Sequence, residues 1–252
     1  MVRVLHASDF HLDSAYGGLS VEQARQRRQE SRDLVRSMVD YGNDHGAQLL
    51  LLAGDLLDSD AVYGQTGAEL SAALSAFRGE VVIAPGNHDC YTAGSPYATT
   101  LWSENVHIFT APTMERIAFP QYGCVVYGGA FTEGEVTERG LSGFSVRPED
   151  GELVKIGLLH GEVGSKTAII APSVWKILPK AASITSPWAT FIATMACKRR
   201  VRSAMPTAAA WKAAASMNWG RRVFCWAILA RALLPCALSP LPAVITASTL
   251  WM

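Results

Sequence analysis

The feature that most constrains the fold of this chain is a set of four short polar clusters, each of which directly follows an apolar run. The runs are short, rich in leucine, isoleucine and valine, and bounded by glycine, proline or polar residues, which is typical of buried β-strands. The four clusters are Asp9-Phe10-His11, Gly54-Asp55, Gly86-Asn87-His88-Asp89 and His160-Gly161. Because the carboxyl ends of parallel strands meet at one edge of a sheet, we expect the clusters to lie together there.

The apolar periodicity between the clusters predicts an α/β fold. Residues 21–45 repeat apolar side chains at spacings of three and four and are followed by Gly46, so we expect a helix that lies on the sheet. A second helix is expected around residues 67–77. The expected strands are residues 2–7, 48–53, 80–84, 106–110, 114–119, 123–130 and 154–159. This alternation of strand and helix implies a largely parallel central sheet.

Oxygen and imidazole donors dominate the clusters, and both are typical ligands of divalent metal ions. Asp9 and His11 stand two residues apart at a strand exit, so their side chains project to the same side and can share one ion. Asp55 has two oxygens with which to bridge two ions, although an aspartate after a strand also commonly caps the next segment. The cluster at Asn87 is more specific, because Asn87 offers a carbonyl ligand and His88, one residue later, points elsewhere and can donate a proton.

Other histidines and arginines receive structural interpretations. His6 lies in the middle of a strand and is interpreted as a core residue, whereas His45 and His107 lie at element ends and are interpreted as solvated. The arginines of residues 21–45 could contact phosphates, but a solvated helix face is favoured because acidic residues are interleaved with them. The arginines are Arg25, Arg27, Arg28, Arg32 and Arg36, and the acidic residues are Glu22, Glu30 and Asp33.

Taken in this order, the motifs D-x-H, G-D, G-N-H-D and H-G resemble the calcineurin-like metallophosphoesterase superfamily. The sequence Ser8-Asp9-Phe10-His11-Leu12-Asp13 resembles its SbcD-type DNA-repair exonuclease branch. The resemblance implies an α/β fold with four layers, an α-β-β-α sandwich in which two sheets pack face to face with helices outside. It also implies two divalent metal ions, Mn²⁺ in the nuclease branch, although such ligands also admit iron, zinc or magnesium.

The same resemblance implies a role for each candidate residue. Asp9 and His11 would hold the first ion, Asp55 would bridge, and Asn87 and His160 would hold the second ion, while His88 would stabilise the transition state and protonate the leaving oxygen. The implied activity is phosphodiester hydrolysis on DNA, by an exonuclease or endonuclease that acts with an SbcC-like ATPase subunit. The resemblance also allows a homodimer. Two alternatives remain, a phosphatase of the same superfamily that acts on small phosphoesters and a non-catalytic remnant of such an enzyme.

The composition changes abruptly after Lys166. Residues 1–166 hold all six histidines, and 12 Lys and Arg against 22 Asp and Glu, a net charge of −10. Residues 167–252 hold no His, Asp or Glu, but 10 Lys and Arg and six of the seven tryptophans. A soluble surface normally mixes both signs of charge. We therefore expect residues 1–166 to form the N-terminal part of a metallophosphoesterase domain, and residues 167–252 to be an aberrant tail without a native fold.

A shifted reading frame explains this tail. The superfamily has a further G-H-x-H motif after the H-G element, yet no histidine follows His160. The codons of residues 188–192 are TGG GCN ACN TTY ATH, and read one base earlier they become NTG GGC NAC NTT YAT, which encodes glycine and then permits His-x-His. The same shift produces a glutamate codon, GAA, from the bases that encode Trp211 and Lys212. We therefore hypothesise that the gene is out of frame from about Thr167, which leaves the sandwich incomplete at its C-terminal side.

A rival interpretation treats the tail as real. Residues 224–251 are apolar apart from Arg231 and follow Arg221-Arg222, a basic flank like those beside membrane spans, but three prolines and the interior arginine weaken it. We expect no membrane span. The five cysteines form no C-x-x-C pair and no secretory signal is evident, so we expect reduced thiols and a cytoplasmic protein. The cysteines are Cys90, Cys124, Cys197, Cys225 and Cys236.

Overall fold

The computed structural model describes residues 2–58, 64–134, 144–160, 223–229 and 248–250. The helices are α1 (Val21–Asp44), α2 (Gly64–Ser75) and α3 (Pro96–Thr99), with 3₁₀ turns at Pro120–Tyr122 and Pro148–Asp150. The strands are β1 (Val2–Ser8), β2 (Leu49–Ala53), β3 (Glu80–Ala84), β4 (Val106–Ile108), β5 (Glu115–Phe119), β6 (Cys124–Gly128), β7 (Val154–Leu158), β8 (Val223–Leu229) and β9 (Ser248–Leu250).

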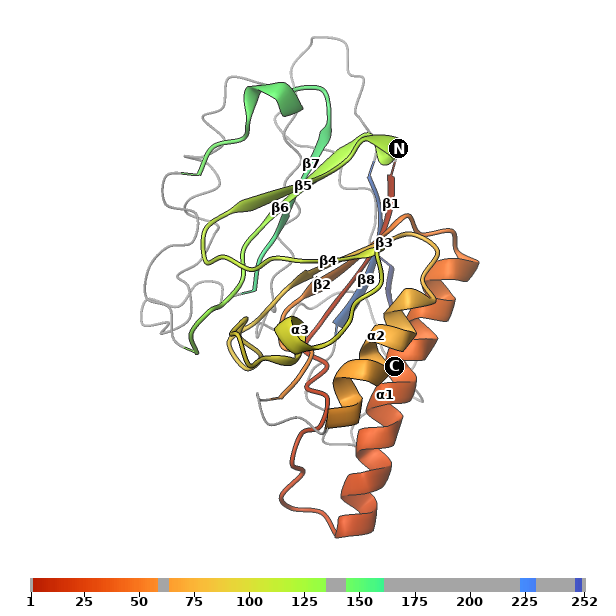
Figure 1. Ribbon diagram of the computed structural model, residues 1–252. Helices are drawn as coiled ribbons and strands as arrows, with labels where there is room; N and C mark the ends of the chain where they lie inside the picture. Colours follow the sequence, from red (N-terminus) through yellow and green to blue (C-terminus); the bar gives the residue numbers. More distant parts are fainter. Residues whose placement is uncertain (1, 59–63, 135–143, 161–222, 230–247, 251–252) are drawn as a thin grey trace.

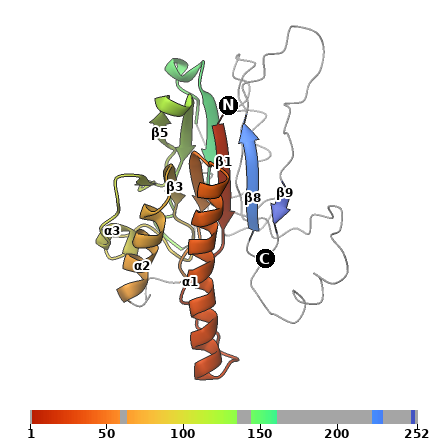
Figure 2. The ribbon, with the colours of Figure 1, turned by 90° about the vertical axis from the view of Figure 1, so that its right-hand side faces the viewer.

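The strands form two sheets (Figure 1). The first has the order β4-β3-β2-β1-β8-β9, and its strands β1 to β4 pair in parallel. The second has the order β5-β6-β7, with β5 antiparallel and β7 parallel to β6. Figure 2 shows β8, which pairs antiparallel with β1, beside that strand. The carboxyl ends of β1, β2 and β3 therefore share one edge of the first sheet.

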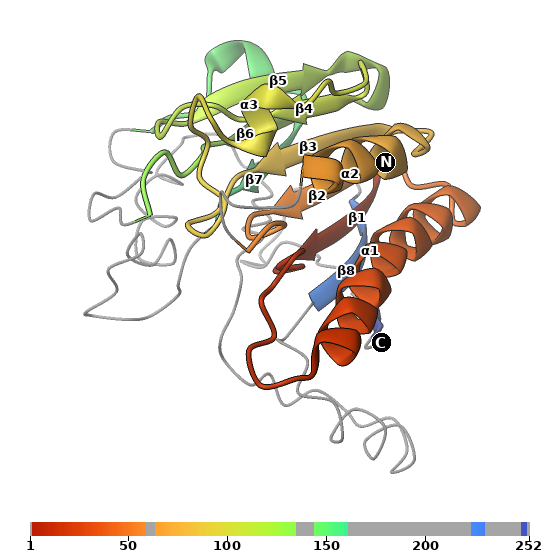
Figure 3. The same ribbon diagram turned by 60° about the horizontal axis from the view of Figure 1, so that its bottom comes forward.

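Two apolar cores lie on the two faces of the first sheet, and the leucine run of β2 contributes to both. Leu50 and Leu52 pack with α1 and α2, whereas Leu49 and Leu51 pack between the two sheets with residues such as Ile156 of β7. All four leucines are at most 1% exposed, and the full burial of each contributes about 1.5–3 kcal/mol to stability. Figure 3 shows the resulting order of layers, with α1 and α2 outside the first sheet and the second sheet on its other face.

Helix α1 forms as its periodicity predicts. The Ser20 side chain accepts from the Gln23 amide, and the Gln23 side chain accepts from the Ser20 amide, which satisfies two donors at the start of the helix. The helix ends before Gly46, which has a φ of +63° and so adopts a left-handed conformation that favours glycine. Its buried face consists of Ala24, Ser31, Val35, Met38, Val39 and Gly42.

The arginine face of α1 is partly solvated as expected, with one difference. Arg27 pairs with Glu30 at 2.7 Å and Arg36 with Asp33 at 2.8 Å, both three residues apart on the helix surface. Arg32 is the exception, because its side chain is only 18% exposed and is paired with Asp13, which lies in the loop after β1. The interpretation of Arg32 as a solvated residue was therefore wrong.

The structure confirms the predicted α/β fold class: two sheets pack face to face, strands β1 to β4 pair in parallel, and α1 and α2 cover the outer face of the first sheet. The predicted strands agree with β1 to β7 to within about two residues at each end, while α2 begins at Gly64 rather than Gly67. His6 is buried as expected. His107 lies within β4 rather than at an element end. Its side chain is half-buried, at 31% exposed, and its Nε2 atom is 2.8 Å from the Glu80 carboxylate.

Most of the expectations for residues 167–252 lie outside the described residues, and the aberrant tail stays a prediction. Within that range the structure describes only β8 and β9. No helix among the described residues is long and apolar enough to cross a membrane. Cys90 and Cys124 are buried thiols and form no disulfide within the part of the chain that the structure describes.

The buried imidazole of His6 should make stability depend on pH. Burial lowers its pKa from 6.5 to about 4. Below pH 6.5 the imidazole of His6 is protonated in the unfolded chain but stays neutral in the folded chain. The contribution of His6 to the free energy of unfolding is therefore constant above pH 6.5 and becomes increasingly unfavourable as the pH falls toward 4. At pH 5 the difference is roughly 2 kcal/mol.

Urea denaturation at pH 7 and pH 5 measures this effect, with His6→Leu as the matched variant. We expect the free energy of unfolding of the unsubstituted chain to fall by about 2 kcal/mol more than that of the variant, since one pKa unit corresponds to 1.36 kcal/mol. Equal losses in the two proteins would show that His6 does not titrate in this way.

Candidate metal centre

Three of the predicted ligands, Asp9, His11 and Asp55, are carried by loops that continue the β1–β2 ladder beyond the strands. The amides of Asp9, His11 and Leu12 donate to the carbonyls of residues 54, 55 and 56, at 3.1, 2.9 and 2.8 Å. Asp9, His11 and Asp55 have left-handed backbones, with φ of 58°, 44° and 53°. Aspartate and histidine adopt this region more readily than most residues, but it persists only where neighbouring contacts hold it. The ladder supplies such contacts.

Asp55 lies at the middle of the predicted ligand set. Its Oδ2 atom is 3.8 Å from Nε2 of His11 and 3.3 Å from Nε2 of His160. Its Oδ1 atom accepts from the His88 amide at 3.1 Å. Donor atoms of Asp9, His11 and Asp55 all lie within 4.8 Å of one another. One carboxylate oxygen thus stands between two imidazole nitrogens, which come from the loops after β1 and β7.

His160 and Asn87 complete the side of the centre next to the second sheet. Nδ1 of His160 donates to the Ala53 carbonyl at 2.9 Å, which turns its Nε2 atom toward Oδ1 of Asn87 at 3.1 Å. The Asp55 carboxylate raises the pKa of His160 to about 9, against the effect of burial, which alone would lower it. His160 therefore carries a proton at neutral pH when nothing else binds its Nε2 atom.

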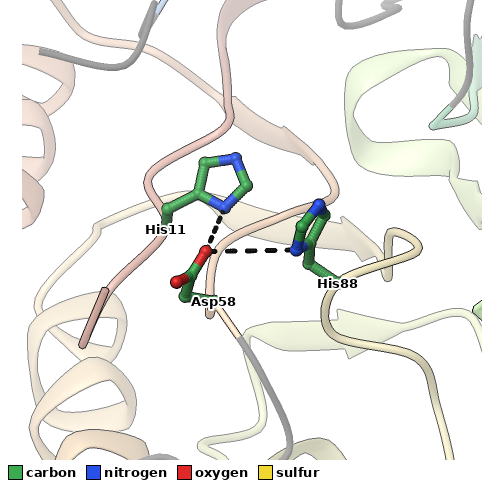
Figure 4. Close-up of side chains that lie close together, drawn as sticks. All are labelled: His11, Asp58 and His88. Carbon is green, nitrogen blue, oxygen red and sulfur yellow. Dashed lines mark hydrogen bonds and ion pairs between the residues drawn. The ribbon is translucent and has the colours of Figure 1, made fainter. Parts of the chain in front are cut away.

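Asp58 joins the two remaining histidines and was missed by the sequence analysis. Its Oδ1 atom accepts from Nδ1 of His11 at 2.9 Å and is 4.0 Å from Nδ1 of His88 (Figure 4). The hydroxyl of Ser14 donates to its Oδ2 atom at 2.9 Å. Because Nδ1–H of His11 points to Asp58, its Nε2 atom is left facing Asp55. In the sequence, only its position three residues after Asp55 pointed to Asp58 as a residue of the site.

Asp89 holds two ligand-bearing loops together, another role that the sequence analysis did not assign. Its carboxylate is 2% exposed and accepts from the main chain of both loops and from the Tyr97 hydroxyl. The donors are the amides of Asp55 at 3.1 Å, Leu56 at 2.7 Å, Leu57 at 3.1 Å and Gly86 at 2.7 Å, and the hydroxyl of Tyr97 at 2.5 Å.

Two glycines allow this close approach. A Cβ atom at Gly86 would collide with the Asp55 carboxylate, and one at Gly54 would collide with the His160 ring. Gly54 also has a φ of +73°, which favours glycine. The G-D and G-N motifs thus bring Asp55, Asn87 and His160 together.

The structure brings all six predicted site residues together at the edge where the carboxyl ends of β1, β2 and β3 lie. A family model described as calcineurin-like phosphoesterase matches residues 2–166. The chain belongs to the calcineurin-like phosphoesterase family. The family match stops at the residue after which the composition changes, and it contains every member of the site.

Two known proteins are similar to this phosphoesterase. "Uncharacterized metallophosphoesterase YhaO" of Bacillus subtilis (strain 168) is 31% identical over 166 residues, which covers 62% of this chain and 40% of that protein. The chain thus spans 40% of the length of this curated relative. The crystal structure of TT1561 of Thermus thermophilus is 16% identical, with a TM-score of 0.44, and the match covers 72% of this chain and 79% of that one.

The charges of the phosphoesterase centre fit divalent cations. Burial raises the pKa of Asp9, whereas hydrogen bonding and the charge of His160 lower the pKa of Asp55 despite its burial. Two carboxylates therefore converge beside imidazole nitrogens and an amide oxygen, which is a mixed oxygen and nitrogen donor set of the kind that Mn²⁺, Fe²⁺ and Zn²⁺ accept. A bound cation would relieve the repulsion between Asp9 and Asp55.

The proton on His160 makes metal affinity depend on pH. A cation that takes Nε2 of His160 must displace this proton, so affinity should rise about tenfold per pH unit while the pH is below the pKa of about 9. Titration calorimetry with Mn²⁺ at pH 7.5, in buffers of different ionisation enthalpy, should report about one proton released per cation bound at this position. Binding without proton release would contradict the assignment of His160 as a ligand.

Proposed function

We propose that this chain derives from an enzyme that hydrolyses phosphoester bonds with two divalent metal ions at this centre, and that the bond is a DNA phosphodiester. The position of Oδ2 of Asp55, 3.8 Å from Nε2 of His11 and 3.3 Å from Nε2 of His160, is the observation that carries the proposal. A carboxylate between two separate sets of ligands is what a two-metal phosphoesterase site requires.

The ligand roles follow from the contacts. Asp9 and His11 face Asp55 from the β1 side and would hold the first ion. Nε2 of His160 is 3.3 Å from Oδ2 of Asp55 and 3.1 Å from Oδ1 of Asn87, and His160 and Asn87 would hold the second ion. Mn²⁺ is the cation we propose, and ions bound there would polarise a phosphoryl oxygen and supply a nucleophile at neutral pH.

His88 is suited to proton transfer rather than to metal binding. Its side chain is 49% exposed, which leaves the ring accessible to a substrate, and Nδ1 lies 4.0 Å from the Asp58 carboxylate. We assign His88 as the group that stabilises the transition state and protonates the leaving oxygen, with Asp58 orienting it.

The nuclease assignment is favoured over a phosphatase of small phosphoesters by the sequence Ser8 to Asp13, which resembles the SbcD-type branch. An SbcC-like ATPase partner, a homodimer and a cytoplasmic location belong to the same proposal. The description of the Bacillus subtilis relative names a metallophosphoesterase and no substrate, so the choice between diester and monoester has to be measured.

Turnover of a chromogenic phosphodiester and of the corresponding monoester, with Mn²⁺, tests the proposal. The assay is made on the chain as it stands and on a version with the shifted frame restored. We expect the diester to be preferred and His88→Asn to lower diester turnover by about 10²- to 10⁴-fold, the usual contribution of general acid–base catalysis. The matched control is His45→Gln, since His45 caps α1 and makes its contact with Tyr41. Preference for the monoester would favour the phosphatase, and equal turnover by His88→Asn would remove His88 from the mechanism.

A further inference from the structure

Asp13 lies two residues after His11, and its carboxylate is buried although it stands in a loop. Its side chain is 3% exposed, and its backbone is left-handed, with a φ of 64°. A buried carboxylate is retained only where it is paired and hydrogen-bonded. Its partners therefore show what this part of the loop is fixed to.

The partners of Asp13 come from both helices that cover the first sheet. The guanidinium of Arg32, on α1, donates to Oδ1 of Asp13 at 2.6 Å, and the Thr66 hydroxyl, on α2, donates to Oδ2. The same guanidinium donates to Thr66 Oγ1 at 3.1 Å and its Nε atom is 3.5 Å from the Glu69 carboxylate. We call Asp13, Arg32, Thr66 and Glu69 the loop clamp.

The clamp and the β1–β2 ladder hold His11 from two sides. On one side, the amides of His11 and Leu12 donate to the loop after β2, and the Asp58 amide donates back to the Leu12 carbonyl at 3.0 Å. On the other side, Asp13 fixes the loop to α1 and α2. His11 itself has a left-handed backbone, a conformation that non-glycine residues keep only where surrounding contacts hold it.

We propose that Asp13 is a positioning residue, which, through the loop clamp, sets the orientation of His11 and thereby the affinity of the centre for its first metal ion. This inference rests on the proposed function, because it takes His11 as a ligand. Asp13 itself does not touch the ion. Loss of its carboxylate leaves the half-buried Arg32 charge without this partner and lets the loop relax at His11, so that Nε2 of His11 no longer faces Asp55.

Titration calorimetry of the full chain with Mn²⁺, below the unfolding temperature, tests the proposal with Asp13→Ala. We expect Mn²⁺ affinity to fall by about 10- to 100-fold, as it does when groups that orient a metal ligand are removed. The visible absorption spectrum of the Co²⁺-loaded protein should also change, since the coordination geometry is altered. Asp13→Asn retains an oxygen for the Thr66 hydroxyl and should lose less affinity than Asp13→Ala.

Arg116→Ala is the matched control. It breaks a comparable pair in the second sheet, where Arg116 donates to the fully buried Asp150 at 2.5 and 2.8 Å. It should lower the unfolding temperature while leaving Mn²⁺ affinity and the Co²⁺ spectrum unchanged. If Asp13→Ala does not fold, Thr66→Val, which removes one donor to the carboxylate, takes its place, with an expected loss of several-fold in affinity.

The outcomes separate this inference from the proposed function. If the unsubstituted chain binds Mn²⁺ and a folded clamp variant binds it equally well with an unchanged Co²⁺ spectrum, Asp13 is a structural residue only and the inference is overturned. If the unsubstituted chain binds no Mn²⁺ at millimolar concentration, the metal centre itself fails, and the inference fails with it.

Discussion

Asp89→Ala is expected to lower the free energy of unfolding by about 4 kcal/mol or more, which is an exceptional loss for a single substitution. The Asp89 carboxylate accepts from four buried main-chain amides and from the Tyr97 hydroxyl. Each buried donor left without an acceptor costs about 1–3 kcal/mol, and water that enters the cavity restores part of this. Because domains of this kind are stable by only about 5–15 kcal/mol, a large share of the variant should be unfolded.

Urea denaturation followed by tryptophan fluorescence measures this loss. Tyr97→Phe is the matched control, because it removes one of the five donors and should lower the free energy of unfolding by only about 1 kcal/mol. The loss in the free energy of unfolding for Asp89→Asn should lie between those of the other two variants, since the amide keeps one accepting oxygen but turns an NH₂ group toward main-chain donors. A loss below about 1.5 kcal/mol for Asp89→Ala would mean that the two ligand loops are held by other contacts.

Restoring the shifted frame after Lys166 is expected to raise Mn²⁺-dependent phosphodiester turnover at least about 100-fold over that of the chain as it stands. No histidine follows His160 in this sequence, whereas the restored frame permits G-H-x-H where the codons of residues 188–192 stand. Each metal ion would thereby regain an imidazole. Even the loss of groups that only support a metal ligand lowers affinity or activity by about 10- to 100-fold.

The two proteins are compared at equal concentration, with Asp55→Asn in the restored frame as the control that should lack activity. Comparable turnover by the chain as it stands would refute the prediction. Resequencing of the gene tests its premise independently: an intact frame across the Lys166 codon, together with peptide masses from residues 167–252, would show that the tail is the natural product.

The strands and their exits could be predicted because their signals are local. The leucine run before Gly54 predicts a strand buried on both faces, and Leu49 to Leu52 do divide between two cores. The motif G-N-H-D places Asn87 beside the next strand exit, and the structure sets its amide oxygen 3.1 Å from Nε2 of His160. Periodicity and turn residues suffice for such features, since they are repeated within a few positions along the chain.

The contacts that support the ligands could not be predicted in the same way. Asp58 lies 47 positions from His11, and Arg32 lies 19 positions from Asp13, so no periodic pattern connects the members of either pair. In the sequence Arg32 is one arginine among five on a helix and looks solvated. Its burial depends on how α1 packs beside α2 and the loop after β1, which is a tertiary property.

The ladder that continues beyond β1 and β2 determines how the amides near the metal centre exchange with deuterium. The amides of Asp9, His11, Leu12 and Asp58 all donate to main-chain carbonyls, so we expect them to exchange at rates closer to those of the strands than to those of ordinary loops. These main-chain hydrogen bonds hold the loop without using any metal ligand atom. Cation binding should therefore carry little loss of chain entropy, because ordering a flexible loop would otherwise oppose it by about 1–2 kcal/mol per residue.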